Sequence, residues 1–166
     1  MRKSWLIGLA VSVFALIMFP AVATAQSGHF LTGGNNAPTC MTVGTGGDTQ
    51  LQCSGKVAGL GGTTFEITVS APATAQVECI NPGGNRAPGQ DTTETATGSS
   101  GPLATPRNGR YNFTVMTDPL GPLPATPTCP NPQWTPVIVG VTFGDATLSL
   151  FEDGVLVDQV TVPGPF

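Results

Sequence analysis

Short runs of alternating apolar and polar residues dominate the chain after residue 26. In Thr64–Ser70 the apolar residues Phe65, Ile67 and Val69 occupy alternate positions, so all three lie on one face of an extended strand. A two-residue period with one apolar face is typical of antiparallel sheets that are solvated on one side. The pattern recurs in three further runs: Thr74–Ile80 (Ala75, Val77 and Cys79), Arg110–Thr117 (Tyr111, Phe113 and Val115) and Thr135–Phe143 (Val137, Val139, Val141 and Phe143).

The carboxyl-terminal region predicts a β-hairpin. Ala146–Glu152 and Val155–Val162 flank an Asp-Gly pair at positions 153–154, which suits the positive backbone angles of a two-residue type I′ turn. Counting outward from that turn places Leu148 opposite the polar Gln159. The apolar register is therefore interrupted, and we expect a bulge or an exposed end.

Six to eight such strands in about 140 residues predict an all-β domain. We expect an immunoglobulin-like antiparallel β-sandwich, with a small closed β-barrel as the alternative, because periodicity does not reveal strand order. Two long connections, Asn81–Asn108 and Asp118–Thr135, interrupt the pattern and are expected to be irregular. Loops of that length in a compact domain are functional, disordered or held by a covalent tie.

The amino terminus has the parts of a secretory signal peptide. Two basic residues precede the apolar stretch Leu6–Val22, and Ala23–Ala25 supplies the small residues needed for cleavage. We expect residues 1–25 to be removed, which leaves residues 26–166 as one domain, secreted to the medium or the cell envelope. A transmembrane anchor is the alternative, and Pro20 near the end of the apolar stretch disfavours it.

Charge is sparse in the part that follows the signal peptide. Four basic residues stand against ten acidic ones there, which gives a net charge of −6. So few cations disfavour binding to nucleic acid and electrostatic attachment to anionic lipid. With nucleic acid and anionic lipid disfavoured, we consider a cell-surface protein or a glycan as the possible partner.

Four cysteines follow the signal peptide, an even number in an exported chain, which predicts two disulfides. A symmetric hairpin around the glycine-rich loop at residues 44–49 places Cys40 directly opposite Cys53. Opposed side chains in an antiparallel pair lie about 4.5–5.5 Å apart, close to the spacing that a disulfide requires. By elimination, Cys79 pairs with Cys129. No two of the four form a Cys-x-x-Cys pair, so we expect no metal site.

Three segments carry a resemblance: CSGKVAGLG at Cys53–Gly61, CINPGGNRAPGQ at Cys79–Gln90 and CPNPQWTP at Cys129–Pro136. In these segments the chain resembles a family of small exported bacterial proteins. The resemblance spans most of the chain after the signal peptide and implies an immunoglobulin-like sandwich and an exported compartment. It implies no catalytic or ligand-binding residue.

No catalytic constellation stands out. His29 is the single histidine, and no Gly-x-Ser-x-Gly elbow supplies it with a nucleophile, so we expect a non-enzymatic protein without a cofactor. A small carbohydrate-active enzyme is an alternative, because Glu66 and Glu78 lie on the outward faces of two neighbouring predicted strands. Glycoside hydrolases use two carboxylates about 5–10 Å apart. A calcium site is disfavoured, because three acidic residues near the carboxyl terminus lack the spacing of a calcium loop: Glu152, Asp153 and Asp158.

If the exported module binds a partner, we expect its two long loops to form the surface, because a rigid sandwich presents ligands on loops. A further alternative is a secreted protease inhibitor that presents the disulfide-held loop Leu120–Thr128. We interpret Trp134 first as a buried side chain that packs in the core beside the Cys79–Cys129 disulfide. The candidate binding surface comprises Asn81, Gly83, Asn85, Arg86, Gln90 and Trp134.

Overall fold

The structure is a computed structural model that describes residues 28–124 and 128–166. The expected signal peptide, residues 1–25, lies outside the described residues. Within the two described ranges the chain forms eleven strands and two short 3-10 helices. Eight of these strands have five or more residues, in agreement with the six to eight predicted. The elements are β1 (His29–Phe30), η1 (Gly34–Asn36), β2 (Thr39–Val43), η2 (Gly46–Asp48), β3 (Gln50–Ala58), β4 (Thr64–Ile80), β5 (Arg86–Pro88), β6 (Thr92–Ser99), β7 (Leu103–Ala104), β8 (Tyr111–Met116), β9 (Thr135–Phe143), β10 (Ala146–Glu152) and β11 (Val155–Val162).

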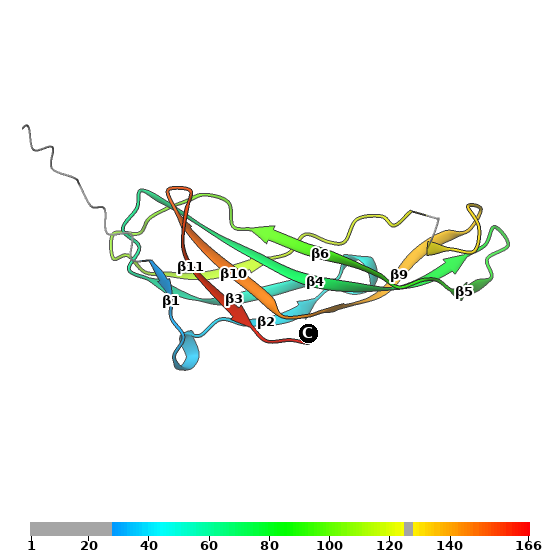
Figure 1. Ribbon diagram of the computed structural model, residues 1–166, viewed down its shortest axis with the longest axis horizontal. Coiled ribbons are helices and arrows are strands. Elements are labelled where there is room, and N and C mark those ends of the chain that lie inside the picture. Colours follow the sequence, from blue (N-terminus) through cyan, green and yellow to red (C-terminus); the bar gives the residue numbers. More distant parts are fainter. Residues whose placement is uncertain (1–27, 125–127) are drawn as a thin grey trace, which may run out of the picture.

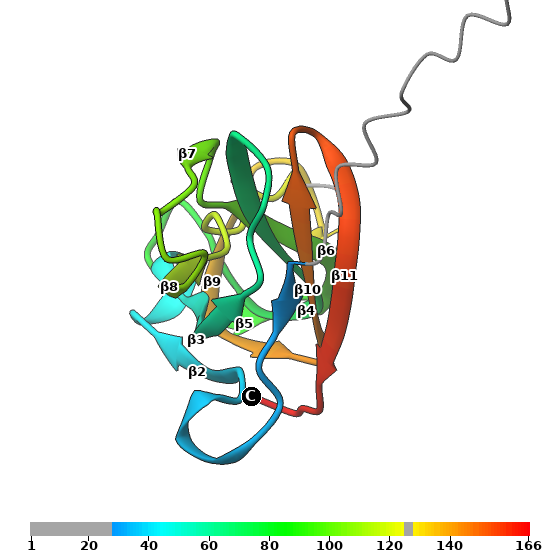
Figure 2. The same ribbon diagram turned by 90° about the vertical axis from the view of Figure 1, so that its left-hand side faces the viewer.

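The strands form two antiparallel sheets, and neither closes into a barrel (Figures 1 and 2). In the small sheet β1 and β2 pair with one edge of β3, and β8 pairs with the other edge. The large sheet runs β11–β10–β4, and β5, β6, β7 and β9 also pair with β4. The predicted antiparallel β-sandwich is therefore confirmed, and the alternative of a closed barrel is wrong. Among the described residues no helix is both long and apolar enough to span a membrane.

The core lies between the two sheets and is built from the alternating apolar positions. Phe65, Ile67 and Val69 of β4 are buried, as the alternation predicted. From the small sheet, Phe113 packs edge to face against Phe30, with 5.6 Å between the ring centroids. The other large apolar side chains of this core are Leu51, Val57, Leu60, Val115, Phe143, Leu148 and Leu150.

One long strand, β4, replaces two strands that the alternation predicted separately, Thr64–Ser70 and Thr74–Ile80. It continues through Pro72 and runs along the long axis of the molecule (Figure 1). β9 and β10 lie end to end along one edge of β4, and at their junction the N–H of Gly144 donates to the Pro72 carbonyl at 2.8 Å. The N–H and C=O of one strand residue point to the same edge, so the N–H that Pro72 lacks falls at this junction. The ladder therefore loses nothing there.

β9 has the predicted bounds, but its inward face changes within the strand. A bulge opposite Gln76–Val77 of β4 leaves Val139 as an extra residue between Ile138 and Gly140. Val139 is 44% exposed. The inward orientation predicted for Val137 and Val139 is wrong, because one inserted residue reverses the alternation beyond it.

β10 and β11 form the predicted hairpin with the predicted bounds. The register shifts between Leu150 and Phe151, so the expected bulge is present. The bulge places Leu148 opposite Val160, and the predicted pairing of Leu148 with Gln159 is wrong. Apolar side chains of both strands thereby share the inner face.

The first long connection, residues 81–108, is not the irregular loop that the sequence predicted. It contains β5, β6 and β7, and all three pair with β4. β6 has the sequence TTETATGS, in which Ala96 is the one buried residue. A strand whose inward face is so small gives almost no apolar periodicity. The second connection contains no strand in its described part, and residues 125–127 lie outside the described ranges.

Candidate functional site

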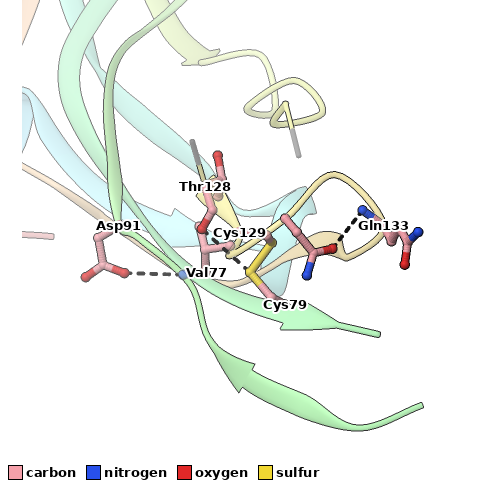
Figure 3. The surroundings of a disulfide bond; sticks show 7 residues. Val77, Cys79, Asp91, Thr128, Cys129 and Gln133 are labelled. Carbon is pink, nitrogen blue, oxygen red and sulfur yellow. Dashed lines mark hydrogen bonds between the residues drawn. A yellow bond between two sulfur atoms is a disulfide. The ribbon is translucent and has the colours of Figure 1, made fainter. Parts of the chain in front are cut away.

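Both predicted disulfides are present. Cys40 and Cys53 face each other across β2 and β3, with 4.1 Å between their Cα atoms, and the predicted hairpin register is confirmed. Cys79 near the end of β4 is joined to Cys129, with 5.8 Å between the Cα atoms. Figure 3 shows this second bridge, which ties the segment before β9 to β4.

The end of β4 that pairs with β5 and β9 extends past the small sheet (Figure 1). The Cys79–Cys129 bridge lies at this end of β4. Val77 and Cys79 are buried there, although they lie outside the main core cluster. The N–H of Gly89 donates to the Val77 carbonyl at 2.8 Å. The Asp91 carboxylate accepts the Val77 N–H at 3.3 Å, as Figure 3 shows. The bridge and the segment after β5 together shield an apolar surface that no second sheet covers. We call this region the clasped end.

Four residues of the predicted binding surface lie in the turn between β4 and β5 and at the start of β5, at the clasped end. Asn81 closes this turn, because its Oδ1 accepts the Asn85 N–H at 2.9 Å and its own N–H donates to the Asn85 carbonyl at 3.0 Å. Gly83 is exposed at the tip. Arg86 forms a 2.8 Å salt bridge with Glu78. These contacts give the turn a structural role, since its polar groups already hold one another.

The other two residues of the predicted surface lie in different segments: Gln90 follows β5, and Trp134 directly precedes β9. Gln90 is exposed, and its backbone N–H donates to the Thr128 carbonyl at 2.9 Å. Trp134 closes a turn, with its N–H donating to the Asn131 carbonyl at 3.2 Å. Its side chain is only partly buried, so it is not the fully buried core side chain that the sequence suggested.

Glu66 and Glu78, the two carboxylates considered for glycoside hydrolysis, lie on the single strand β4 and not on neighbouring strands. Twelve positions separate them, which corresponds to roughly 40 Å in an extended strand. Glu66 accepts a hydrogen bond from the Ser99 hydroxyl, and Glu78 is paired with Arg86. The predicted proximity of these two carboxylates is therefore wrong, and they cannot act on one bond within one chain.

The three acidic residues considered for calcium all accept backbone N–H groups, Glu152 and Asp153 from the segment that leads into β4 and Asp158 from β1. They tie the β10–β11 hairpin to the strands and loops around it. No cluster of three or more His, Cys, Asp or Glu side chains suited to a metal ion occurs in residues 28–124 and 128–166. Glu152 accepts from Gly61 (2.7 Å), Asp153 from Thr63 (3.0 Å) and Thr64 (2.8 Å), and Asp158 from Phe30 (2.7 Å).

Two further candidates from the sequence stand apart from these sites. His29 is exposed on β1, where it pairs with Ala58. The candidate inhibitor loop, Leu120–Thr128, lies partly outside the described residues, at 125–127, and stays a prediction.

A groove that the sequence did not predict lies over the small sheet, with a volume of about 480 Å³. Residues of β2, β3 and β8 line it together with the loop around η1, which Figure 2 shows in blue beside β2. Its polar character comes from amide and hydroxyl side chains, and no carboxylate lines it. These neutral polar residues are Asn35, Asn36, Thr39, Ser54, Asn112 and Thr114.

The strand register brings these side chains together on one face. Thr39, Ser54 and Thr114 form a row across β2, β3 and β8, and Lys56 faces Asn112 in the adjacent row. The alternate residues of β3 include buried core residues, so Ser54 and Lys56 point outward. The paired strands fix the spacing of the row, because cross-strand neighbours lie about 4.5–5.5 Å apart.

Gly55 lets the Phe113 ring pack against the inner face of β3, directly behind the groove. A Cβ at this position would come within 3.0 Å of the Phe113 ring and within 3.0 Å of the Pro38 Cα. Phe113 is itself buried and packs against Phe30. The groove is thus backed by packed aromatic side chains, which makes its floor rigid.

Sequence reasoning missed the groove because its residues come from three distant segments. Each segment contributes only one to three outward polar residues, which is also the pattern of any solvated strand face. The Asn35-Asn36 pair is the one local feature that could have drawn attention to it.

No protein-family model matches this chain, and no curated protein matches it. Several solved structures align with most of it at low similarity, among them the following two. A calcium-binding mutant of Bacteroides uniformis beta-glucuronidase 2 is 15% identical with a TM-score of 0.39, over 84% of this chain and 14% of that one. A glycosyl hydrolase family 2 member from Bacteroides cellulosilyticus DSM 14838 is 11% identical with a TM-score of 0.32, over 82% of this chain and 15% of that one. The chain spans about one seventh of each, and such a likeness assigns it neither fold nor function.

Proposed function

We propose that the protein is an exported, non-catalytic β-sandwich module that binds a glycan in the groove of the small sheet. The observation that carries this proposal is a groove of about 480 Å³ lined by six residues with amide or hydroxyl side chains, four of which share the outward face of the small sheet. Asn, Ser and Thr side chains both donate and accept hydrogen bonds, as sugar hydroxyls do. A rigid array of such groups is therefore suited to a polyhydroxylated ligand.

The backbone pairing under the groove favours a glycan over a peptide strand. Thr39 and Thr114 pair with Ser54 from the two edges of β3, and Asn112 pairs with Lys56. Peptides that add to a sheet need unpaired backbone N–H and C=O groups. These ladders are already formed, so recognition here falls to the side chains.

The two disulfides support export, because such bonds persist in oxidising compartments. A non-catalytic role is proposed because the two carboxylates considered for glycoside hydrolysis lie too far apart to act on one glycosidic bond. Glu66 and Glu78 are roughly 40 Å apart along β4. The groove itself is lined by no carboxylate, histidine or cysteine that could act as acid, base or nucleophile.

The test is a glycan array followed by titration calorimetry with the purified, oxidised protein. Thr114→Val removes one hydroxyl from the groove at nearly constant volume, and Asn112→Ala removes one amide. Loss of one hydrogen bond should weaken binding about fivefold in each variant. The matched control is Thr95→Val, which removes an exposed hydroxyl from β6 of the other sheet. An array on which no glycan binds, or equal affinities for Thr114→Val and Thr95→Val, would reject the proposal.

A further inference from the structure

One cation lies in the groove. Lys56 lines it, and none of the other lining residues is charged. Cations are rare in this protein, which has six Lys and Arg against ten Asp and Glu over its whole length. The groove is therefore a positively charged site on an acidic protein.

The position of Lys56 is fixed by its surroundings. Its residue pairs with Asn112 of β8, and its carbonyl accepts the Leu31 N–H at 2.9 Å on the opposite edge of β3. The side chain is only partly exposed. Partial burial reduces screening by water, so a ligand charge in the groove would interact with this ammonium group more strongly than at an open surface.

The ammonium group of Lys56 also forms no salt bridge with another described residue. The described residues contain one salt bridge, and it joins Arg86 to Glu78 at the clasped end. A cation that has no ion pair and lines a groove of neutral hydrogen-bonding groups is suited to a ligand that supplies the anion itself.

We propose that the groove selects an anionic saccharide, with its acidic group on the Lys56 ammonium and its hydroxyls on the surrounding amide and hydroxyl side chains. This inference rests on the proposed glycan-binding function. Lysine acts as a point charge and imposes no planar geometry, so a uronate carboxylate and a sulfate ester are both accommodated. An acidic peptide would meet the same charge, but it lacks the hydroxyls that the rest of the groove is built to bind.

The first experiment needs no variant of the protein. A uronate oligosaccharide and its methyl ester differ only in charge, and a sulfated analogue supplies the second anion. One charge-assisted hydrogen bond predicts about tenfold tighter binding of the acid than of the ester. Added salt should weaken binding of the acid and leave the ester unchanged. Equal affinities for acid and ester, or failure of both to bind when a neutral glycan on the array does bind, would overturn the anionic selectivity and leave the proposed glycan binding intact. An array on which no glycan binds would overturn both proposals.

Variants then assign the effect to Lys56. Lys56→Met keeps an unbranched apolar side chain and removes the charge, so it should bind the acid about tenfold more weakly and the ester as before. Arg107→Gln removes an exposed cation that does not line the groove and should change neither affinity. A Lys56→Met variant that loses affinity for both ligands equally would assign Lys56 a packing role instead. A glutamate-rich peptide that displaces the acid as well as the free saccharide does would overturn the saccharide specificity.

Discussion

The N–H of Gly144 donates to the carbonyl oxygen of Pro72 across the middle of the large sheet, at 2.8 Å. This bond joins the end of β9 and the start of β10 to the centre of β4. It lies beside the one position in β4 that has no N–H to donate. A Cβ at position 144 would come within 2.8 Å of the Pro72 Cγ, so the junction requires glycine.

Gly144→Ala should therefore destabilise the protein by about 1–3 kcal/mol, because the rigid proline ring cannot move aside without shifting β4. Equilibrium unfolding in urea measures this change. Gly121→Ala is the control, since a Cβ there meets nothing within 4 Å. The control should leave the free energy of unfolding unchanged or slightly raised. Equal stabilities of the two variants would contradict this account of the junction.

The two disulfides should differ in their contributions to stability. Cys79–Cys129 closes a sequence separation of 50 residues and Cys40–Cys53 one of 13. The chain-entropy model gives about 4 kcal/mol for the first and about 3 kcal/mol for the second. We expect the double variant Cys79→Ala/Cys129→Ala to unfold at lower urea concentration than Cys40→Ala/Cys53→Ala.

Hydrogen exchange locates the effect of the first bridge. Without it, the amides of residues 76–80 should exchange faster, because the clasped end loses the cover over Val77. The pairs β2–β3 and β3–β8 should keep their protection. Uniformly faster exchange across both sheets would show that the bridge stabilises the whole fold and not the clasped end.

The carboxyl group of Asp153 should make the free energy of unfolding depend on pH in a defined direction. Hydrogen bonds from the backbone N–H groups of Thr64 and Thr63 hold the pKa of its carboxyl below its ordinary value of 3.8. The ionised form is favoured in the folded state, so its stabilising effect is complete above about pH 4 and is lost as pH falls through the lowered pKa. Asp153→Asn keeps the side-chain shape and suits the positive φ of 47° at this position.

The measurement is the difference in unfolding free energy between the wild type and Asp153→Asn from neutral to acidic pH. The difference should be constant at neutral pH and shrink below about pH 4. Asp48→Asn, at an exposed aspartate in η2, is the control for general charge effects. A difference that grows on acidification has the wrong sign for a lowered pKa.

Catalysis by Glu66 or Glu78 would have to proceed without the other, given their separation along β4. We expect no turnover of aryl glycosides, and identical glycan affinities for the wild type, Glu66→Gln and Glu78→Gln. Glu78→Gln should cost less than about 1 kcal/mol of stability, because its partner Arg86 is 62% exposed. Hydrolysis that disappears in either variant would instead assign the protein an enzymatic role.

Several features of the fold follow from local pattern alone. The loop at residues 44–49 places Cys40 opposite Cys53 by simple counting, and that register is confirmed residue by residue. The bounds of β9, β10 and β11 also follow from the alternation and the Asp-Gly turn. Local pattern succeeds here because each strand is apolar on one face and ends at residues that favour turns.

The bulges and the weak strands did not follow from the pattern. Val139 carries an apolar side chain at an apparently inward position, and only its pairing with β4 shows that it is the extra residue of a bulge. β6 presents a single buried alanine and is held in the sheet by its backbone ladder to β4. A ladder depends on the partner strand, which a single segment does not reveal.

The sequence by itself determined the all-β class, most strand positions and the Cys40–Cys53 pairing, because each depends on spacing within short segments, and the even number of cysteines then left Cys79 to pair with Cys129. Only the tertiary structure decided that β4 runs unbroken through Pro72, since that depends on which strands meet at Gly144. It also decided the groove, where Asn35, Lys56 and Thr114 come from segments far apart in the chain. A site of that kind exists only after the sheet has set its register, because pairing across strands, and not order along the chain, makes these side chains neighbours.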